Sequence, residues 1–396
     1  MTATSVESTP SSSLTSTLIR LMFRMGSVGT GLIALAAGLL YVKQESLLYF
    51  PEIGGIPRRP DSNPRGYRSP TEYNIPFESN MIRCEDGVFV HSWLLLHPNS
   101  KAARRPTIVF FHGNAGNIGL RLPNAHQMYS KLNANILMVE YRGYGNSDSV
   151  KPTEKGLKLD AEAALNFIAA HPQIDPQRLF CFGRSLGGAV AFHLAKYSQV
   201  HRKPLAGIIV ENTFLSISSM VDQLMPLVAP FKFLILRMDW GNEKVAPAVK
   251  APVLYLAGDR DELVPHDHMV KLFEYSSKAS DYPQMHVIRG GTHNDSWMVG
   301  GGEYFVKFKA FMSHVMLNEN DRDDNGFSST SSLDGGVVST GGSDTVEVTM
   351  GQDGTVGIGL EKNAIPVMPN NFVGIAKEAT KASSSADTNA SDKKKS

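Results

Sequence analysis

Residues 179–188, with the sequence LFCFGRSLGG, constrain the fold of this chain more than any other stretch. The first four residues are apolar or aromatic and predict a buried strand, and residues 189–197 predict a helix. Between them lies a G-x-S-x-G pattern centred on Ser185. A strand that turns directly into a helix strains the backbone at the turn, and flanking glycines give the room this requires. The stretch therefore predicts a nucleophile elbow that presents the Ser185 hydroxyl at the C-terminal end of the strand.

Composition limits the functional classes. The chain has 396 residues, of which 42% are hydrophobic and 19% charged, and it is large enough to bury a sizeable core. The formal net charge of +1 does not favour a nucleic acid or a strongly acidic partner. Cys84 and Cys181 both fall on predicted strands, so we expect two buried thiols rather than a disulfide.

An uncharged apolar run covers residues 25–42 and is about as long as the shortest segment that spans a bilayer. A cleavable signal peptide is the alternative, because Ala34 and Ala36 offer small residues at a suitable spacing. The run continues past that point, which favours an uncleaved signal anchor. Arg20 and Arg24 precede it and favour a cytoplasmic N-terminus, with the rest of the chain across the membrane.

Composition also divides the rest of the chain. Residues 1–24 are rich in Ser and Thr and are predicted to be disordered, and residues 43–70 predict an extended connector. The globular domain is expected at 71–316, and the low-complexity tail at 317–396 is predicted to be disordered. The last four residues match a dilysine retrieval signal, which is read in the cytosol and conflicts with a lumenal C-terminus.

Within the domain, apolar strand-like runs alternate with helix-like segments. Two antiparallel strands are expected within 75–96, and the later runs predict a mostly parallel sheet with helices on both faces. Residues 215–248 are very apolar at their start and interrupted by prolines, which predicts a small cap of short helices. This cap either lines an apolar substrate pocket or touches the membrane, or it is ordinary core packing.

Ser185 needs a base that is itself oriented by an acid. The candidate base is His293, in a glycine-rich loop after the last predicted strand. Asp261 is the preferred acid, but Asp259 lies on the same loop and stays an alternative. Glu211, at the end of the preceding strand, is a third candidate.

A serine that attacks an acyl group also needs an oxyanion hole made of backbone N–H groups. One donor is expected from Leu186, directly after the nucleophile. Asn114 is the preferred source of the second, with Ala115 next to it, and His112 is expected to brace their loop. No phosphate-binding or dinucleotide-binding fingerprint is present, and His266, Asp267 and His268 form no convincing metal set, so we expect no metal and no cofactor.

Six motifs occur in this order along one domain: HGNAGN, YRGYGNS, GRSLGG, ENTF, GDRDELVP and GGTHND. Together they resemble the α/β-hydrolase superfamily, and most of all alpha/beta hydrolase domain-containing protein 13 and its relatives, including the fungal bud-emergence proteins. The resemblance covers about residues 45–315. It implies an α/β-hydrolase fold behind one N-terminal membrane span, with Ser185 as nucleophile, Asp261 as acid and His293 as base.

The leading interpretation is a membrane-anchored serine hydrolase that cleaves carboxylic esters or thioesters of a lipid or acylated substrate through an acyl-enzyme. An amidase or peptidase fits the same residues. The alternative is a polarity or membrane-organisation factor that uses the fold for binding with little turnover, and a third possibility is a secreted esterase. We expect a single-pass protein of the endoplasmic reticulum or another endomembrane, with a lumenal catalytic domain. The sequence does not indicate an oligomeric state.

Overall fold

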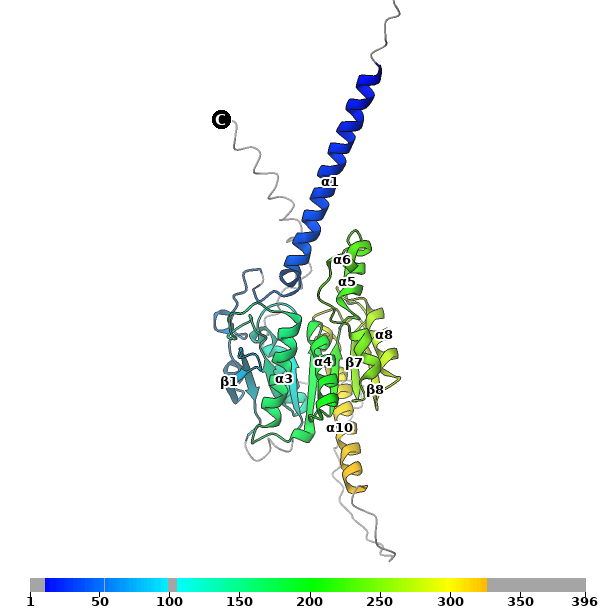
Figure 1. Ribbon diagram of the computed structural model, residues 1–396. Coiled ribbons are helices and arrows are strands. Elements are labelled where there is room, and N and C mark those ends of the chain that lie inside the picture. The colour runs from blue at the N-terminus through cyan, green and yellow to red at the C-terminus, as the bar shows by residue number, and fades with distance from the viewer. Residues whose placement is uncertain (1–10, 53, 99–104, 326–396) are drawn as a thin grey trace, which may run out of the picture. The chain divides into compact units, whose positions relative to one another are not determined.

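The structure, a computed structural model, describes residues 11–52, 54–98 and 105–325 (Figure 1). The predictions for residues 1–10 and 326–396 concern segments outside these described residues. The described strands form one eight-stranded sheet in the order β1-β2-β4-β3-β5-β6-β7-β8. Their bounds are Phe77–Arg83 (β1), Phe89–Leu95 (β2), Thr107–Phe111 (β3), Asn135–Val139 (β4), Leu179–Arg184 (β5), Gly207–Glu211 (β6), Val253–Gly258 (β7) and Pro283–Ile288 (β8).

The sheet is mostly parallel, as predicted. β2 pairs antiparallel with both β1 and β4, and the remaining neighbours run parallel. The register sets Phe111 beside Gly183 and Arg184 beside Glu211, so the C-terminal ends of β3, β5 and β6 form a row. Loops that leave this edge are therefore neighbours, although they are far apart in the sequence.

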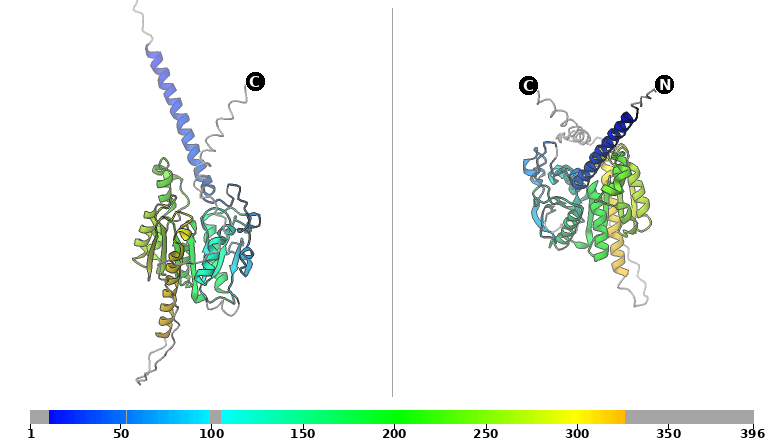
Figure 2. Two further views of the ribbon diagram at one scale, coloured as in Figure 1. Left: turned by 180° about the vertical axis from the view of Figure 1, so that it is seen from behind. Right: turned by 45° about the horizontal axis from the view of Figure 1, so that its top comes forward.

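Helices cover both faces of the sheet, and their bounds are Leu122–Leu132 (α2), Glu154–Ala169 (α3), Leu186–His201 (α4), His266–Ser276 (α8), Ser296–Val299 (α9) and Gly301–Asn325 (α10). Figure 1 shows α3 and α4 over one face, and the view from behind in Figure 2 shows α10 over the other. On β5 the ring of Phe182 packs toward α10, with its centroid 6.0 Å from that of Phe308, while Cys181 joins the core on the α4 side. Both cysteines are buried and free, as predicted.

The segment between β6 and β7 consists of short helices, as predicted for the cap: Ile217–Leu224 (α5), Ala229–Phe231 (η6), Lys232–Ile235 (α6), Asn242–Val245 (α7) and Ala246–Ala248 (η7). Its later part packs into the domain, where Met238 and Trp240 are buried. Residues 224–234, here named the cap tip, instead carry exposed apolar side chains, with Leu227 90% and Phe233 78% exposed. Core packing therefore explains the later part of the cap but not its tip.

The N-terminal helix α1 is longer than predicted, since it covers Ser11–Leu48. The expected disorder up to residue 24 is wrong from Ser11 onward, and the expected connector starts only after Leu48. The physical reason is that no proline lies between Pro10 and Pro51, so nothing there removes a helical hydrogen bond. Within α1, Arg20–Leu48 is long and apolar enough to span a membrane, with a mean hydropathy of 1.7 and none of its apolar window buried.

The last helix extends beyond the expected end of the domain at residue 316, because α10 continues to Asn325. Residues 318–325 are all polar, a composition that predicts the end of the domain but is compatible with a helix. The first glycine after Gly302 is Gly326, directly beyond the observed end. By its internal contacts the chain divides into two units after Met312. The candidate active site lies entirely in the first unit.

Candidate active site

Ser185 occupies the sharp turn between β5 and α4, and the strained backbone predicted there is present. Its φ of 55° and ψ of −119° lie outside the regions that non-glycine residues favour. The flanking glycines are required by close approach. A Cβ on Gly183 would lie 2.0 Å from the carbonyl oxygen of Gly187, and one on Gly187 would lie 2.1 Å from that of Phe111. No side chain fits at either position, so the pattern has a steric cause.

His293 and Asp261 are brought together from two loops at the same edge of the sheet. His293 Nδ1 lies 2.8 Å from Asp261 Oδ2, and both side chains are almost fully buried. The other carboxylate oxygen, Oδ1, accepts the backbone N–H groups of Leu263 and Val264 at 2.9 and 2.8 Å. The loop therefore holds the carboxylate with Oδ2 directed at the imidazole.

Asp259, the alternative acid, has a different contact. Its Oδ1 accepts the N–H of Gly290 at 2.6 Å, and this bond fastens the loop after β7 to the turn after β8. The two aspartates therefore differ in their contacts. Asp261 is the one that contacts His293, whereas Asp259 holds the turn after β8. Glu262, which the sequence did not indicate, accepts the backbone N–H of His293 at 3.2 Å.

Glu211, the third candidate acid, belongs to a buried ion pair instead. Its carboxylate oxygens lie 2.9 and 3.2 Å from Nε and Nη2 of Arg184, and the Tyr304 hydroxyl donates to it at 2.6 Å. Burial acts to lower the pKa of Arg184, but the charges and hydrogen bonds of Glu211 and Tyr304 together outweigh it and raise that pKa. The pair locks β5 to β6 directly below the elbow, and the Glu211 carboxylate is not directed at His293.

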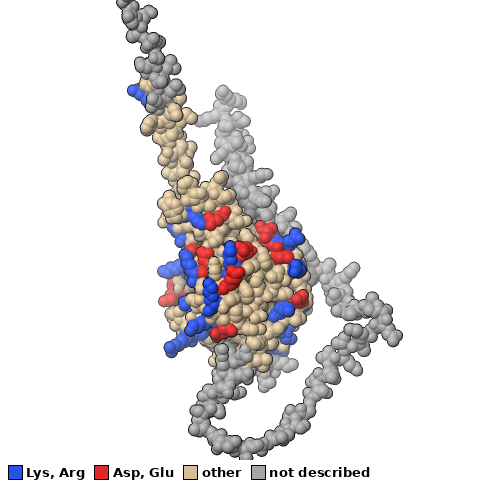
Figure 3. Space-filling view, turned by 90° about the vertical axis from the view of Figure 1, so that its right-hand side faces the viewer, with Lys and Arg blue, Asp and Glu red and all other residues tan. Residues whose placement is uncertain are grey.

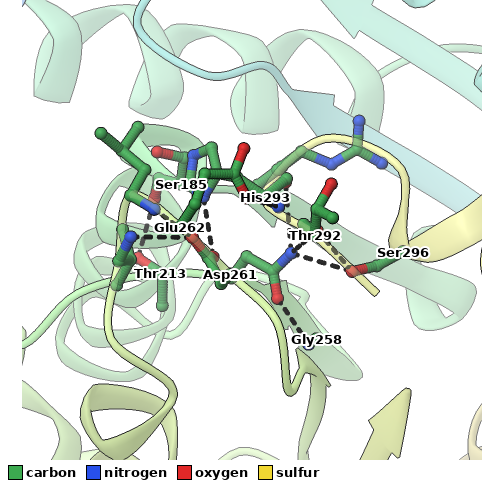
Figure 4. Close-up of polar contacts among 12 residues, drawn as sticks. Ser185, Thr213, Gly258, Asp261, Glu262, Thr292, His293 and Ser296 are labelled. Carbon is green, nitrogen blue, oxygen red and sulfur yellow. Dashed lines mark hydrogen bonds and ion pairs between the residues drawn. The ribbon is translucent and has the colours of Figure 1, made fainter. Parts of the chain in front are cut away.

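Asn212 joins the end of β6 to the histidine side of the site, where Figure 4 labels its partners Gly258, Thr292 and His293. Its Nδ2 donates to the carbonyl oxygens of Thr292 and His293 at 2.9 and 3.2 Å, and its Oδ1 accepts the N–H of Gly258 at 2.8 Å. One amide therefore ties the end of β6 to the end of β7 and to the histidine loop. Its left-handed backbone, with a φ of 46°, suits asparagine. Asn212 belongs to the motif ENTF, but the sequence alone does not indicate which groups its amide binds.

The expected oxyanion loop lies against the elbow. A Cβ on Gly113 would be 3.7 Å from the Ser185 Cβ, so the loop after β3 passes directly beside the serine. Leu186 is the first residue of α4, so its N–H has no acceptor within the helix and is available to a ligand. Asn114 and Ala115 are in the same loop, and the fully buried His112 places Nδ1 2.7 Å from the Gly113 carbonyl, as a brace would.

The part of the chain that the structure describes holds no group of three or more His, Cys, Asp or Glu side chains suited to a metal ion. Of the histidines after Pro265, His268 is buried, which lowers its pKa, and its Nδ1 accepts the Leu215 N–H at 3.4 Å. What the site does assemble is a serine on a strained turn, a buried imidazole oriented by a carboxylate, and a backbone loop beside the serine.

Comparison with known proteins identifies the family of the chain. Protein bem46 of Schizosaccharomyces pombe is 34% identical over 311 residues, which cover 77% of this chain and 98% of bem46. The chain belongs to the bem46 group of α/β hydrolases. The alpha/beta hydrolase domain-containing protein WAV2 of Arabidopsis thaliana is 36% identical over 69% of this chain and 89% of its own. An uncharacterized membrane protein of Saccharomyces cerevisiae is 32% identical over 71% of this chain and 92% of its own.

The family described as "Serine aminopeptidase, S33" matches residues 102–240. Among solved structures, an esterase of Pyrococcus furiosus, Pf2001, superposes with a TM-score of 0.53 at 17% identity, covering 68% of this chain and 97% of the esterase. At this identity the likeness concerns the fold alone. The predicted superfamily, subgroup and fold are therefore confirmed.

We predict that Asn212→Ala loosens the histidine loop. Removing the amide leaves buried carbonyl and N–H groups without partners, which we expect to lower the free energy of unfolding by about 1 to 3 kcal/mol. Hydrogen exchange of residues 290–296 should accelerate, as measured by mass spectrometry on the full chain in detergent. Asn133→Ala is the matched control, because Asn133 is exposed, has a similar φ of 56° and lies outside this network. Equal effects of both variants would show that the backbone conformation, and not the amide, is responsible.

Proposed function

We propose that this α/β hydrolase is a membrane-anchored serine hydrolase that cleaves carboxylic esters or thioesters. The observation that carries the proposal is the 2.8 Å contact between the buried His293 and Asp261, on the sheet edge where the elbow presents Ser185. A structural role alone does not explain why a serine is kept at a φ of 55° between two glycines that admit no side chain.

In the proposed mechanism, Ser185 Oγ attacks the acyl carbon while His293 takes its proton. The negative oxygen of the tetrahedral intermediate is bound by the backbone N–H groups of Leu186 and of the Asn114 loop. When the intermediate collapses, the bond to the alcohol or thiol breaks and His293 gives that leaving group its proton. Water, activated by the same imidazole, then releases the acid and restores the serine. Asp261 keeps the imidazole in the required orientation throughout.

A lipid or otherwise acylated substrate is favoured by the cap tip and by α1. The exposed apolar side chains of the cap tip include Phe231, Phe233 and Leu234. Figures 1 and 2 show α5 and α6 on the side of the domain from which α1 departs. In Figure 3 the lower part of α1 and the top of the domain beside it carry few charged side chains, whereas charged side chains of both signs gather farther down. This arrangement supports a position of the cap tip at the surface of the membrane that α1 is proposed to span.

Labelling of the full chain with a fluorophosphonate probe tests the proposed nucleophile and acid. We expect labelling of the wild type and none of Ser185→Ala, because the probe phosphonylates an activated serine. Asp261→Asn should lower the labelling rate by about 10³-fold or more, since it removes the carboxylate that orients the imidazole. Asp259→Asn is the matched control and should label within about threefold of the wild type, since it retains the Asp261 carboxylate.

If the folded wild type does not label, the hydrolase proposal fails. The alternative, a polarity or membrane-organisation factor that uses this fold for binding with little turnover, would then be favoured. Labelling that persists in Ser185→Ala would place the nucleophile elsewhere.

The role of the cap tip is tested with the double variant Leu227→Ser/Phe233→Ser. We expect hydrolysis of a long-chain acyl ester in phospholipid vesicles to fall about 3- to 10-fold, because the tip no longer favours the interface. Hydrolysis of soluble p-nitrophenyl acetate should not change. Met81→Ser/Val200→Ser removes two exposed apolar side chains from β1 and from the far end of α4, and is the control. A parallel loss with both substrates would contradict an interfacial role.

We also propose that the protein is a single-pass membrane protein of the endoplasmic reticulum or another endomembrane, with the catalytic domain lumenal. Arg20 and Arg24 on the N-terminal side of the apolar run support this orientation. In sealed vesicles, protease added outside should remove an N-terminal tag and leave the domain intact until detergent is added. Digestion of the domain without detergent would reverse the orientation, and release of the protein by alkaline carbonate would exclude the anchor.

A further inference from the structure

The chain that leaves α1 is bonded directly to the loop expected to form the oxyanion hole. The Phe50 N–H donates to the carbonyl of Asn114, and the Phe50 carbonyl accepts the N–H of Gly116, both at 2.9 Å. These two bonds form an isolated parallel bridge between Phe50 and Ala115. Phe50, which the sequence assigned to an extended connector, therefore pairs with the loop beside Ser185 as a residue of a parallel strand would.

Side chains reinforce this bridge. Asn114 Nδ2 donates to the carbonyl of Leu48, the last residue of α1, at 2.9 Å. The Tyr144 hydroxyl donates to the Asn114 carbonyl at 2.7 Å, so that this carbonyl accepts twice. Burial raises the pKa of Tyr144 well above its ordinary value, which keeps the hydroxyl protonated as a donor at neutral pH. Asn114 is thus held through both its side chain and its backbone.

The same end of α1 is bonded to the cap. Gln44 Oε1 accepts the N–H of Arg237 at 2.8 Å, and Glu45 binds the Arg237 guanidinium through both oxygens at 2.7 and 2.8 Å. The buried Tyr49 accepts the indole N–H of Trp240 at 3.0 Å. Within the seven residues from 44 to 50, the chain is therefore attached first to the cap and then to the loop at the nucleophile.

We propose that Phe50 is a positioning residue of the active site, and that residues 44–50 hold the 113–116 loop at the distance from Ser185 that an oxyanion hole requires. The inference rests on the proposed function. Backbone donors stabilise an oxyanion only where they point at it, and a displacement of about 1 Å can cost about 10²-fold in rate. Because residues 113 and 116 are glycines, the loop has few side chains that could hold its backbone in one conformation. Residues 44–50, at the end of α1 and directly after it, hold the loop in place from outside.

The test compares Phe50→Pro with Phe50→Ala in the full chain in detergent. Both variants remove the ring, but only proline removes the N–H that donates to Asn114. We expect Phe50→Pro to lower kcat for p-nitrophenyl acetate at least 10-fold relative to Phe50→Ala, with KM changed less than about 2-fold. The Ki of phenylboronic acid, whose serine adduct places an oxygen in the oxyanion hole, should rise by a similar factor. A merely structural role would lower the melting temperature without separating kcat from KM.

A second pair of variants covers the case in which proline prevents folding. Tyr144→Phe removes one donor to the Asn114 carbonyl, and we expect kcat to fall about 3- to 10-fold. Tyr255→Phe is the matched control, because it deletes an equally buried hydroxyl that bonds Leu272 and Ser276 on the side of α8. Equal kcat values in Tyr144→Phe and Tyr255→Phe, or in folded Phe50→Pro and Phe50→Ala, would overturn the proposal.

Hydrogen exchange separates this inference from the proposed function. The Gly116 amide, which donates to Phe50, should be protected in the wild type and in Phe50→Ala, and should lose protection in Phe50→Pro. Unchanged protection in Phe50→Pro would overturn the positioning role, because the loop would then stay in place without the Phe50 N–H. A Gly116 amide that exchanges freely in the wild type would refute the bridge itself, whatever the activity. A protected wild type that neither labels nor hydrolyses esters would overturn the proposed function and the positioning role together, while leaving the bridge intact.

Discussion

The site depends on the distance between the backbone of the elbow and its neighbours. The first turn of α4 lies so close to the end of β3 that the Phe111 carbonyl occupies the place of a side chain at Gly187. This contact brings the loop after β3 beside Ser185, and it puts the first N–H groups of α4 on the same side. A larger residue at position 187 would separate the two, and the serine would face an open gap instead of backbone donors.

The parallel arrangement of the strands explains why remote loops can combine at this point. β3, β5, β6 and β7 all end at one edge, so the loops that follow them need only short contacts to become one site. Asn212 provides several of these contacts at once, because its amide bonds the loops after β7 and β8 from the end of β6. The Arg184–Glu211 pair fixes the two strands behind it. Asp261 thus orients the imidazole, and Asn212 fixes the backbone of Thr292 and His293 that carries it.

Much of this could be predicted from the sequence, since local patterns determine it. The elbow, the strands, and the pairing of a late histidine with an aspartate after β7 each have a short motif. The choice between Asp259 and Asp261 could not be made from spacing, because both follow the same strand by a few residues and only the turn geometry directs one of them to His293. Asn212 was overlooked for a similar reason. The carbonyl groups that its amide binds lie about 80 residues away, and the motif ENTF around it does not indicate them.

The segment after α1 shows a different limit of sequence patterns. Residues 43–70 contain glycine, proline and arginine in proportions typical of a linker, and composition carries no information about a single-residue bridge such as that of Phe50 with Ala115. Composition also does not reveal that Glu45 is almost buried between Arg237 and Lys151. An ordinary linker would let the domain move freely relative to α1. Here the helix end is bonded to the cap and to the loop beside the serine. If α1 tilted against the domain, it would break the charged contacts with the cap and the backbone hydrogen bonds with the loop. The orientation of the helix in a bilayer would therefore determine which face of the cap meets the lipid.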